Sequence, residues 1–406
     1  MVVVGAGHAG GRAAERLRFN GYAGAITLVG GESHRPYERP PLSKGVLTAD
    51  RLAAPPFLMD QDNWDALAVD FLNDRRCLSI DRTARRVTLS GGEVLAYEHL
   101  ILATGLTQRR LPQLDAVDDR VLTLHSYDEA CTLRERLGRG VTVALIGAGF
   151  IGLEVAASAR QRGAEVLVIE AADRPLARAL PAALSAWVGR LHRGFGVDLR
   201  CGRQILSAEV GDRGVRIGLA GGEACDADFI LCGIGGRPND DLARQAGLRC
   251  SDGVEVDQGC RTSDPRVFAI GDIACMPDPY SALPRRLESW KNAEETAAVA
   301  AANICGRARA YTTAPWFWTD QYGLNIQFTG DLGGQGGGAR SLLQRGQVGE
   351  PGYLAYLLDG EMLIGAFGID CGGDIRRARG LLEKGGEVTD KQLRKAGVGP
   401  LEGGVE

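Results

Sequence analysis

The sequence contains no Cys-x-x-Cys pair, although ten of its 406 residues are cysteines. Paired spacings of that kind hold zinc or form redox dithiols, so the pattern favours reduced thiols in a cytoplasmic protein without a metal site. No apolar run approaches the ~18 residues of a membrane-spanning helix. The N-terminus also lacks the basic segment and long apolar core of a secretory signal. We therefore expect no membrane partner.

An excess of positive charge is also missing, because 47 Lys and Arg residues face 51 Asp and Glu residues and the net charge is −4. Nucleic-acid-binding proteins are usually basic, so no nucleic-acid partner is expected. Glycine, in contrast, is abundant at 57 residues, about twice its average share of ~7%. Because the glycines do not form low-complexity repeats, this excess indicates many tight turns and close backbone approaches, as in nucleotide-binding folds.

Two segments resemble each other, and each predicts a strand, a glycine turn and a helix. They span residues 2–17 and 143–159, and each is followed by a second apolar run that ends near an acid, at Glu32 and Glu170. Both contain the motif Gly-x-Gly-x-x-Gly, formed by Gly5, Gly7 and Gly10 in the first segment and by Gly147, Gly149 and Gly152 in the second.

Each glycine of such a motif has its own role. The first permits the tight turn, the second lets the backbone approach a pyrophosphate, and the third lets helix and strand pack closely. The helix N-terminus offers N–H groups and a positive dipole to the phosphates. A single motif is a weak signal that a plain glycine turn could explain, but two in the same context predict two dinucleotide sites. Within the two motifs, His8, Ala9, Phe150 and Ile151 are also expected to contact the cofactors.

The acids after the two units predict which nucleotides bind. Glu170 closes its strand and is expected to bond the ribose hydroxyls of NAD, where a 2′-phosphate would be repelled, so NADH is favoured over NADPH. Arg174, four residues on, is the neighbour that would suit a phosphate. Glu32 follows Gly30-Gly31 and is expected to bind the ribose of FAD, the alternative being an exposed carboxylate.

Two other segments are candidates for flavin contacts. Residues 39–44, Arg-Pro-Pro-Leu-Ser-Lys, read as a stiff, extended stretch that would hold the Lys44 cation at a fixed point, although an ordinary loop is the alternative. A buried strand within 262–272 leads to Gly271 and Asp272. Asp272 could accept hydrogen bonds from the ribityl chain of FAD, or be a plain turn residue.

The remaining pattern predicts a helix over 288–304 with Ser289 as its N-cap, a hairpin over 353–367 and a basic helix over 374–384. The predicted fold class is α/β, with two Rossmann-like dinucleotide-binding domains and a C-terminal α+β domain at 311–406.

With these motifs the chain resembles the FAD-dependent ferredoxin reductases of bacterial oxygenase systems, a family that includes putidaredoxin reductase and the reductases of aromatic-ring dioxygenases. This family belongs to the wider glutathione-reductase-like class. The resemblance covers residues 1 to about 330. It rests on both glycine motifs and on residues 40–44, 103–105, 271–272, 288–290 and 315–321. It implies a discontinuous FAD-binding domain, 1–112 and 241–310, and an NAD-binding domain, 113–240. The chain departs from the family at Gln108, usually a proline, and in the glycine-rich stretches 333–338 and 371–373.

The resemblance also implies roles for particular residues. Lys44 would lie beside the isoalloxazine and pair with Glu154, the expected catalytic pair, although Glu154 could simply be an acid that suits a helix N-terminus. Trp290 would begin a helix whose positive end faces the flavin, and Trp318 would line the flavin pocket or belong to the core. Other cofactor contacts implied by position are Arg39, Cys77 through its backbone, Ala103, Thr104, Gly105, Arg109 and Gly235.

The activity implied is hydride transfer from NADH to FAD, followed by single electrons to an acidic [2Fe–2S] ferredoxin, with rubredoxin as another possible carrier. Disulfide reductases of the class carry a cysteine pair near residues 39–44, and none is present here. Two alternatives remain open, an NADH oxidase or peroxidase and a signalling flavoprotein like apoptosis-inducing factor. The candidate docking cations are Arg285, Arg286, Arg307, Arg309, Arg376, Arg377 and Arg379.

Overall fold

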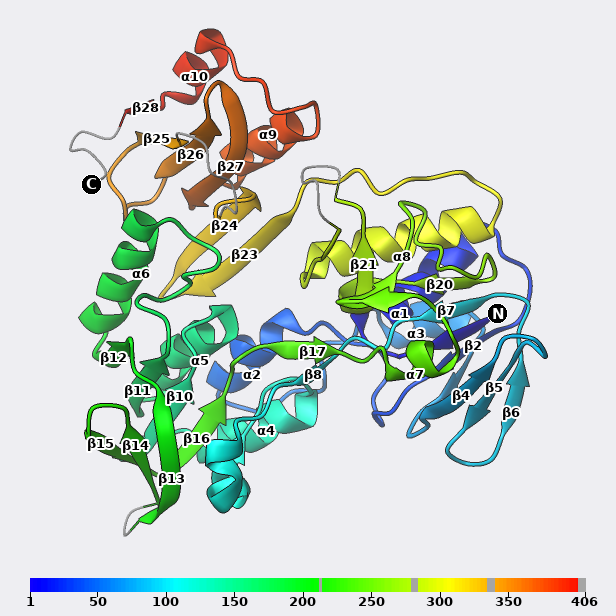
Figure 1. Ribbon diagram of the computed structural model, residues 1–406, viewed down its shortest axis with the longest axis horizontal. Coiled ribbons are helices and arrows are strands. Elements are labelled where there is room, and N and C mark those ends of the chain that lie inside the picture. The colour runs from blue at the N-terminus through cyan, green and yellow to red at the C-terminus, as the bar shows by residue number, and fades with distance from the viewer. Residues whose placement is uncertain (212–213, 279–283, 334–339, 401–406) are drawn as a thin grey trace. The chain divides into compact units, whose positions relative to one another are not determined.

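The computed structural model describes residues 1–211, 214–278, 284–333 and 340–400, which form two compact units (Figure 1). The first unit consists of Met1–Arg39, Ala54–Thr107 and Gly236–Thr313. The second consists of Pro40–Ala53, Gln108–Gly235 and Ala314–Glu406. Residues 334–338 of the predicted glycine-rich stretch lie outside the described residues.

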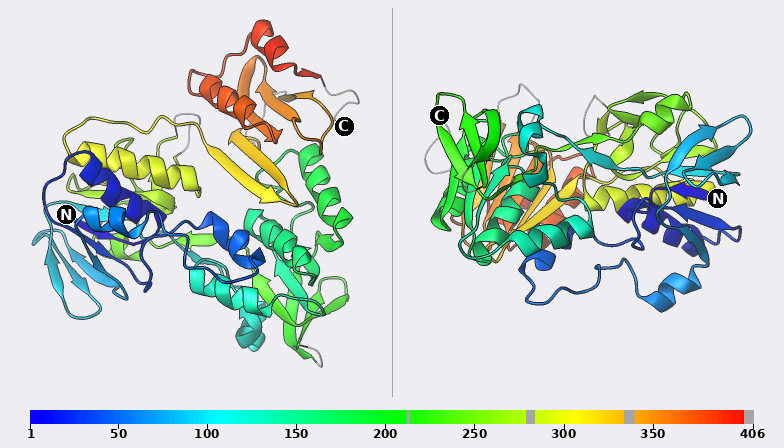
Figure 2. Two further views of the ribbon diagram at one scale, coloured as in Figure 1. Left: turned by 180° about the vertical axis from the view of Figure 1, so that it is seen from behind. Right: turned by 90° about the horizontal axis from the view of Figure 1, so that it is seen from below.

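The first unit is built on a five-stranded parallel sheet in the order β20-β7-β1-β2-β3. Its strands are β1 (Val2–Val4), β2 (Ile26–Val29), β3 (Val69–Leu72), β7 (Leu100–Leu102) and β20 (Val267–Ala269). Strands β1, β7 and β20 are buried along their whole length, as is typical of parallel strands covered on both faces. Helices α1 (His8–Phe19) and α8 (Trp290–Ile304) pack side by side (Figures 1 and 2).

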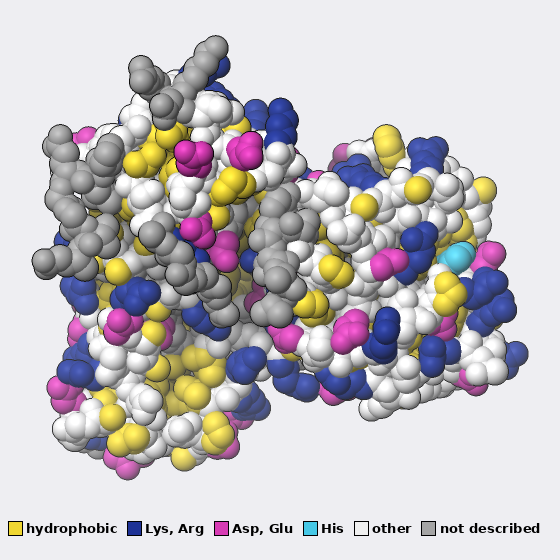
Figure 3. Space-filling view, turned by 45° about the horizontal axis from the view of Figure 1, so that its top comes forward, with side chains coloured by type: hydrophobic (Ala, Val, Ile, Leu, Met, Phe, Trp, Pro, Cys, Tyr) yellow, Lys and Arg dark blue, Asp and Glu magenta, His cyan; other side chains and the backbone are white. Residues whose placement is uncertain are grey.

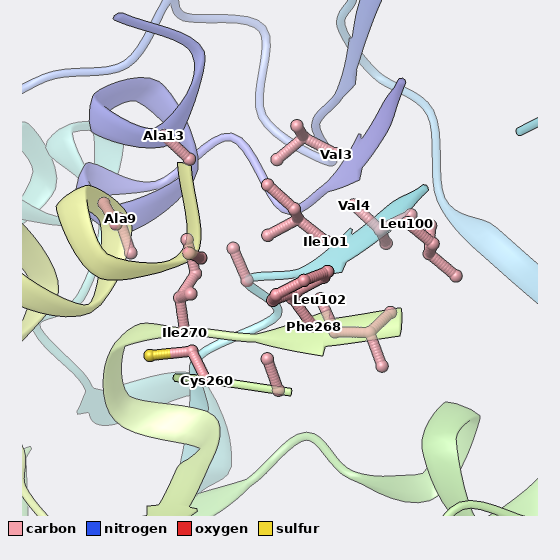
Figure 4. Packing of buried hydrophobic residues seen from close by; sticks show 14 of the residues in the cluster. Val3, Val4, Ala9, Ala13, Leu100, Ile101, Leu102, Cys260, Phe268 and Ile270 are labelled. Carbon is pink, nitrogen blue, oxygen red and sulfur yellow. The ribbon is translucent and has the colours of Figure 1, made fainter. Parts of the chain in front are cut away.

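The core of this unit lies between the sheet and these helices. Figure 4 shows the apolar side chains of β1, β7 and β20 packed together, with Ala9 and Ala13 of α1 beside them. The small side chains of α1 let the helix approach the sheet closely. The smaller elements of the unit are α3 (Gln61–Ala66), β4 (Cys77–Asp81), β5 (Arg86–Leu89), β6 (Val94–Ala96), α7 (Asp241–Gln245), β18 (Cys250–Ser251), β19 (Gly253–Glu255), η3 (Gly271–Ile273), β21 (Ala274–Met276) and β22 (Arg285–Arg286).

The second unit contains another five-stranded parallel sheet, in the order β12-β11-β10-β16-β9. Its strands are β9 (Val121–Leu122), β10 (Thr142–Ile146), β11 (Glu165–Glu170), β12 (Val197–Cys201) and β16 (Phe229–Cys232). A three-stranded antiparallel sheet accompanies it. The other elements of this part are η2 (Pro112–Arg120), α4 (Tyr127–Arg136), α5 (Phe150–Gln161), α6 (Ala182–Gly194), β13 (Ile205–Gly211), β14 (Gly214–Leu219) and β15 (Ala224–Ala227). The chain leaves and re-enters the first unit through β8 (Leu106–Gln108) and β17 (Gly236–Pro238).

A six-stranded antiparallel sheet, in the order β23-β24-β27-β26-β25-β28, forms the C-terminal part of the second unit. The predicted hairpin is present, and the predicted basic helix begins two residues early, at Gly372. The fold class predicted from the sequence is therefore confirmed. The elements are β23 (Trp316–Gln321), β24 (Leu324–Gly330), β25 (Arg340–Arg345), β26 (Leu354–Asp359), β27 (Met362–Ile369), α9 (Gly372–Leu382), α10 (Asp390–Ala396) and β28 (Gly399–Pro400).

The prediction of a stiff, extended stretch at 39–44 is wrong. Pro40–Ser43 form a 3₁₀ turn, η1, and Gly45–Thr48 form the short helix α2. The ring of proline fixes φ near −65°, which suits a 3₁₀ turn as well as an extended chain. Residues 40–53 belong to the second unit, where Arg134 of α4 donates hydrogen bonds to the carbonyls of Ala49 and Asp50.

None of the helices in the described ranges combines the length and the apolar character that crossing a bilayer requires. Positive and negative side chains are interspersed over the face shown in Figure 3, consistent with the small net charge of the sequence.

Candidate functional site

The first glycine motif forms a turn that only glycine can make at two of its positions. Gly5 has a φ of +110°, and a Cβ atom there would overlap the carbonyl oxygen of Ala103. A Cβ atom on Gly10 would overlap the carbonyl oxygen of Gly5. In front of Gly7 the protein leaves space, because the nearest atom to a Cβ there is a guanidinium nitrogen of Arg39 at 3.5 Å. This open position is where the backbone would approach a phosphate.

The second motif repeats this geometry. Gly147 has a φ of +99°, and its Cβ would lie 2.6 Å from the carbonyl oxygen of Gly233. A Cβ on Gly152 would overlap the carbonyl oxygen of Gly147, whereas one on Gly149 would meet nothing within 4 Å. Helices α1 and α5 begin directly after Gly7 and Gly149, with no side-chain cap and no acid in the first turn. Uncapped N–H groups and the helix dipole suit the pyrophosphates of FAD and NAD.

Glu32 and Arg39 lie together beside the first turn. One carboxylate oxygen of Glu32 accepts a hydrogen bond from Arg39 at 2.8 Å, and the other accepts one from the Tyr37 hydroxyl at 2.5 Å. Since Arg39 is also the group nearest Gly7, a cation lies at the expected phosphate position and an acid at the expected ribose position. Their roles as FAD ligands stay predictions.

His8, the first residue of α1, belongs to a charged cluster that connects α1 with α8. Its two ring nitrogens lie 2.9 Å from Glu294 and 3.3 Å from Glu38. Burial alone would lower the pKa of His8, but the hydrogen bonds to Glu294 and Glu38 outweigh it, so the pKa is raised. Arg12 also pairs with both acids. The indole of Trp290 donates a 2.6 Å hydrogen bond to Glu38, which fixes the tryptophan at the start of α8.

Asp272 lies in η3, immediately after Gly271, whose φ is +70°. Burial, together with the nearby charge of Glu288, raises the pKa of Asp272 to about 7, although Arg286 acts in the opposite direction. A carboxyl group that is easily protonated in this setting can both accept and donate hydrogen bonds, which suits the hydroxyls of a ribityl chain. The hydroxyl of Thr104, another predicted cofactor contact, donates a hydrogen bond to the carbonyl of Asn239.

The second glycine turn opens into a cavity of about 770 Å³ in the second unit. Glu170 lines it, and its carboxylate accepts hydrogen bonds from the backbone N–H groups of Ala148 at 2.6 Å and Ala172 at 2.8 Å. Each oxygen keeps a further lone pair for a ribose hydroxyl. The flanking cations are Arg178 and Arg203, whereas Arg174 pairs with Asp173 and is not among the lining residues.

Lys44 and Glu154 form an ion pair, with the ammonium nitrogen 2.8 Å from one carboxylate oxygen. Glu154 lies on α5 and is 2% exposed, so it is a buried acid rather than a simple partner of the helix dipole. Three donors surround it, because the hydroxyls of Ser43 and Thr319 also donate to its carboxylate. The ion pair implied by the resemblance is present, and its position beside a flavin stays a prediction.

The remaining predicted residues are spread over both units. The backbone N–H of Arg109 donates to the carbonyl of Gly235 at 2.9 Å. Cys77 begins β4, and burial raises the pKa of its thiol to about 11, so the thiol is not a nucleophile. Trp318 stacks on Trp316, with ring centres 5.1 Å apart. None of these contacts tests a role in cofactor binding. Within the described ranges, no cluster of His, Cys, Asp and Glu side chains is arranged to hold a metal ion.

The candidate docking cations differ in how free they are. Arg286 is only 6% exposed and pairs with Asp252 and Glu288, so it is poorly suited to docking. Arg377 is 66% exposed although it pairs with Asp374. Surface pairs of this kind are weak, so such an arginine can exchange partners.

Sequence reasoning missed the partners that orient the predicted residues. Ser43 and Thr319 lie within segments that carry the family resemblance, but nothing in the sequence identified them, or Glu38, as contacts of Glu154 and His8. Only the fold brings them to His8 and Glu154, from as far as 165 positions along the chain. Rules for helix capping and for charge pairs relate residues only a few positions apart, so they could not predict these contacts.

Comparisons with known proteins agree with this geometry. Residues 1–297 match the family model described as pyridine nucleotide-disulphide oxidoreductase, and residues 316–399 match the one described as reductase C-terminal. The chain is 38% identical to the anthranilate 1,2-dioxygenase system ferredoxin–NAD(+) reductase component of Burkholderia cepacia, over 98% of both chains. It is also 38% identical to terpredoxin reductase of a Pseudomonas species, over 89% of this chain and 88% of the relative.

Among solved structures, putidaredoxin reductase in its covalent complex with putidaredoxin superposes with a TM-score of 0.89 and 32% identity, over 94% of this chain and 92% of that one. With both glycine turns, the buried Lys44–Glu154 pair and full-length relatives in agreement, the chain belongs to the pyridine nucleotide-disulphide oxidoreductase family, among the ferredoxin reductases of oxygenase systems.

Proposed function

We propose that this protein is an NADH-dependent ferredoxin reductase that supplies electrons to an oxygenase. The observation that carries the proposal is the segment 40–48. Where disulfide reductases of the class carry a cysteine pair, this chain presents Lys44, paired with the buried Glu154. The relative from Burkholderia cepacia is named as a ferredoxin–NAD(+) reductase component, and putidaredoxin reductase was solved in complex with putidaredoxin. Both support a [2Fe–2S] ferredoxin as the acceptor.

The residues divide between two cofactors. FAD, when bound, accepts the hydride of NADH and releases electrons singly. The start of α1 with Gly7 would hold its pyrophosphate, Glu32 its ribose and Asp272 its ribityl chain. The start of α5 with Gly149 and Glu170 would hold NADH. Lys44 and the N-terminal end of α8 would provide positive charge at the flavin, where negative charge develops on reduction.

We further propose the three-domain division with boundaries at 112/113, 240/241 and 310/311, and a cytoplasmic location. All ten cysteines are free, which suits a reducing compartment.

The function is tested by following cytochrome c reduction by NADH with the FAD-loaded protein. We expect fast reduction only when a [2Fe–2S] ferredoxin is added, and slower reduction with rubredoxin. Buffer without carrier, and carrier without NADH, are the controls. Rapid oxygen consumption that does not depend on a carrier would instead identify an oxidase.

Glu170 is expected to set the choice of nucleotide. In Glu170→Ala, KM for NADH should rise roughly tenfold while kcat falls less, because a bond to the ribose is present in both ground and transition states. The preference for NADH over NADPH should also weaken, since Arg178 and Arg203 remain in the cavity. Steady-state kinetics with both nucleotides checks this. Arg174→Ala, outside the cavity lining, is the matched control, and equal efficiency of the parent protein with both nucleotides would contradict the argument.

A further inference from the structure

A series of hydrogen bonds leads from Glu154 of α5 to Tyr322. The Thr319 hydroxyl lies 2.6 Å from Glu154, and the side-chain amide of Gln321 lies 3.0 Å from the Thr319 hydroxyl. The ring of His192 lies 2.7 Å from the amide oxygen of Gln321. The hydroxyl of Tyr322 lies 3.0 Å from the other ring nitrogen of His192. The series therefore links α5, β23 and α6 within the second unit.

The side chains that form this series of hydrogen bonds are buried. Glu154, Thr319, Gln321 and His192 are each 2% exposed or less. Polar side chains at such depth are costly unless each finds a partner. Here every link is satisfied by the next, and the last residue, Tyr322, stacks on Phe195 with ring centres 3.9 Å apart and planes at 7°.

Donors and acceptors can be assigned to these hydrogen bonds in only one order. The carboxylate of Glu154 can only accept, so the Thr319 hydroxyl donates to it and must itself accept from the Gln321 amide nitrogen. The Gln321 amide oxygen then faces His192, whose Nε2 must carry the proton, and Nδ1 accepts from the Tyr322 hydroxyl. The opposite direction would require a protonated Glu154, which the Lys44 ammonium 2.8 Å away opposes.

We propose that Thr319, Gln321 and His192 are positioning residues that fix the Glu154 carboxylate and, through it, the Lys44 ammonium. The proposal rests on the proposed role of Lys44 at the flavin. Lys44 is the N-cap residue of the short helix α2, whose four residues give it little rigidity of its own. One oxygen of the Glu154 carboxylate accepts a hydrogen bond from Ser43, and the other accepts one from Thr319. A positively charged group held in one place needs no reorganisation when charge develops opposite it.

Thr319→Val tests the proposal, because valine keeps the shape of threonine and removes its hydroxyl. Reduction of bound FAD by NADH, measured by stopped flow, should slow roughly tenfold. Thr319→Ser should restore it. In the Lys44→Met background, Thr319→Val should have no further effect, since a positioning residue acts only through the group it positions. An equal effect in both backgrounds, or no rescue by serine, would overturn the proposal.

A second measurement needs neither NADH nor activity. The chain has five lysines, so labelling lysine with ¹⁵N gives few ammonium signals, and Lys44→Met assigns one of them. Thr319→Val should shift the Lys44 signal and Thr319→Ser should not. Imidazole ¹⁵N signals of the parent protein should show His192 protonated at Nε2, and an Nδ1 proton would refute the stated direction. If NADH failed to reduce the parent protein, the proposed function would fall while these signals would still decide the positioning role.

Discussion

Replacing Lys44 with methionine is expected to slow the reduction of bound flavin by NADH by roughly 10²-fold, which is the usual cost of removing one fixed electrostatic group from an active site. The substitution removes the cation and leaves Glu154 buried with only neutral donors. Removing one partner of a buried ion pair leaves an uncompensated charge, which is strongly destabilising. Rapid-mixing absorbance of the flavin is the measurement.

Two variants control this experiment. Lys44→Arg keeps the charge but replaces a compact ammonium with a planar guanidinium, so partial activity is expected. This chain has no other lysine among residues 1–290 and otherwise uses arginine there, which suggests that a compact cation is needed at position 44. Arg216→Met removes an exposed ion pair between Arg216 of β14 and Asp226 of β15, and it should have no effect. Reduction by NADH at the parental rate in Lys44→Met would rule out the proposed role.

Acid should destabilise the protein through His192. Burial lowers the pKa of His192 to about 4, from an ordinary value of about 6.5. Between these values the unfolded chain binds a proton that the folded protein does not, so stability is lost as pH falls from about 6.5 to about 4. The full difference corresponds to about 3 kcal/mol, a large share of the 5–15 kcal/mol typical of a folded domain.

His192→Gln should remove this dependence, because glutamine does not titrate. Urea unfolding between pH 7.5 and 4.5 would show a smaller loss of stability in the variant, although the variant starts lower at neutral pH. His8→Gln is a useful contrast. The pKa of His8 is raised, so its contribution is present below its unfolded pKa and is lost as pH rises through the folded one. An unchanged acid slope in His192→Gln would mean that the buried ring is already protonated.

The parts of the site that could be predicted from sequence are local. The two glycine motifs could be recognised because strand, turn and helix follow one another within about ten residues, and the expected cap of α8, Ser289, does accept the N–H of Asn292. Glu170 was found for the same reason, since it ends the strand after the motif. The resemblance to a family added the Lys44–Glu154 pair, which no spacing rule would give.

What sequence could not predict depends on the tertiary fold. Ser43 and Thr319 reach Glu154 across 111 and 165 positions, and Glu38 and Glu294 meet only because α1 packs on α8. Arg174, noted in the sequence because it would suit a 2′-phosphate, is not among the residues that line the cavity. Its closeness to Glu170 in the sequence does not determine the direction of its side chain, which donates a hydrogen bond to Asp173 instead.

The order of strands in the first sheet has a consequence for synthesis on the ribosome. Strand β20 pairs with β7 and α8 packs on α1, yet β7 ends at Leu102 and β20 begins at Val267. At roughly 5–20 residues per second, the intervening segment takes on the order of ten seconds to translate. During that time the nascent chain would carry an unpaired, apolar strand edge, which is prone to aggregation. Early chaperone contacts should therefore concentrate on β7 and its neighbours, which remain without β20 until it has been synthesised.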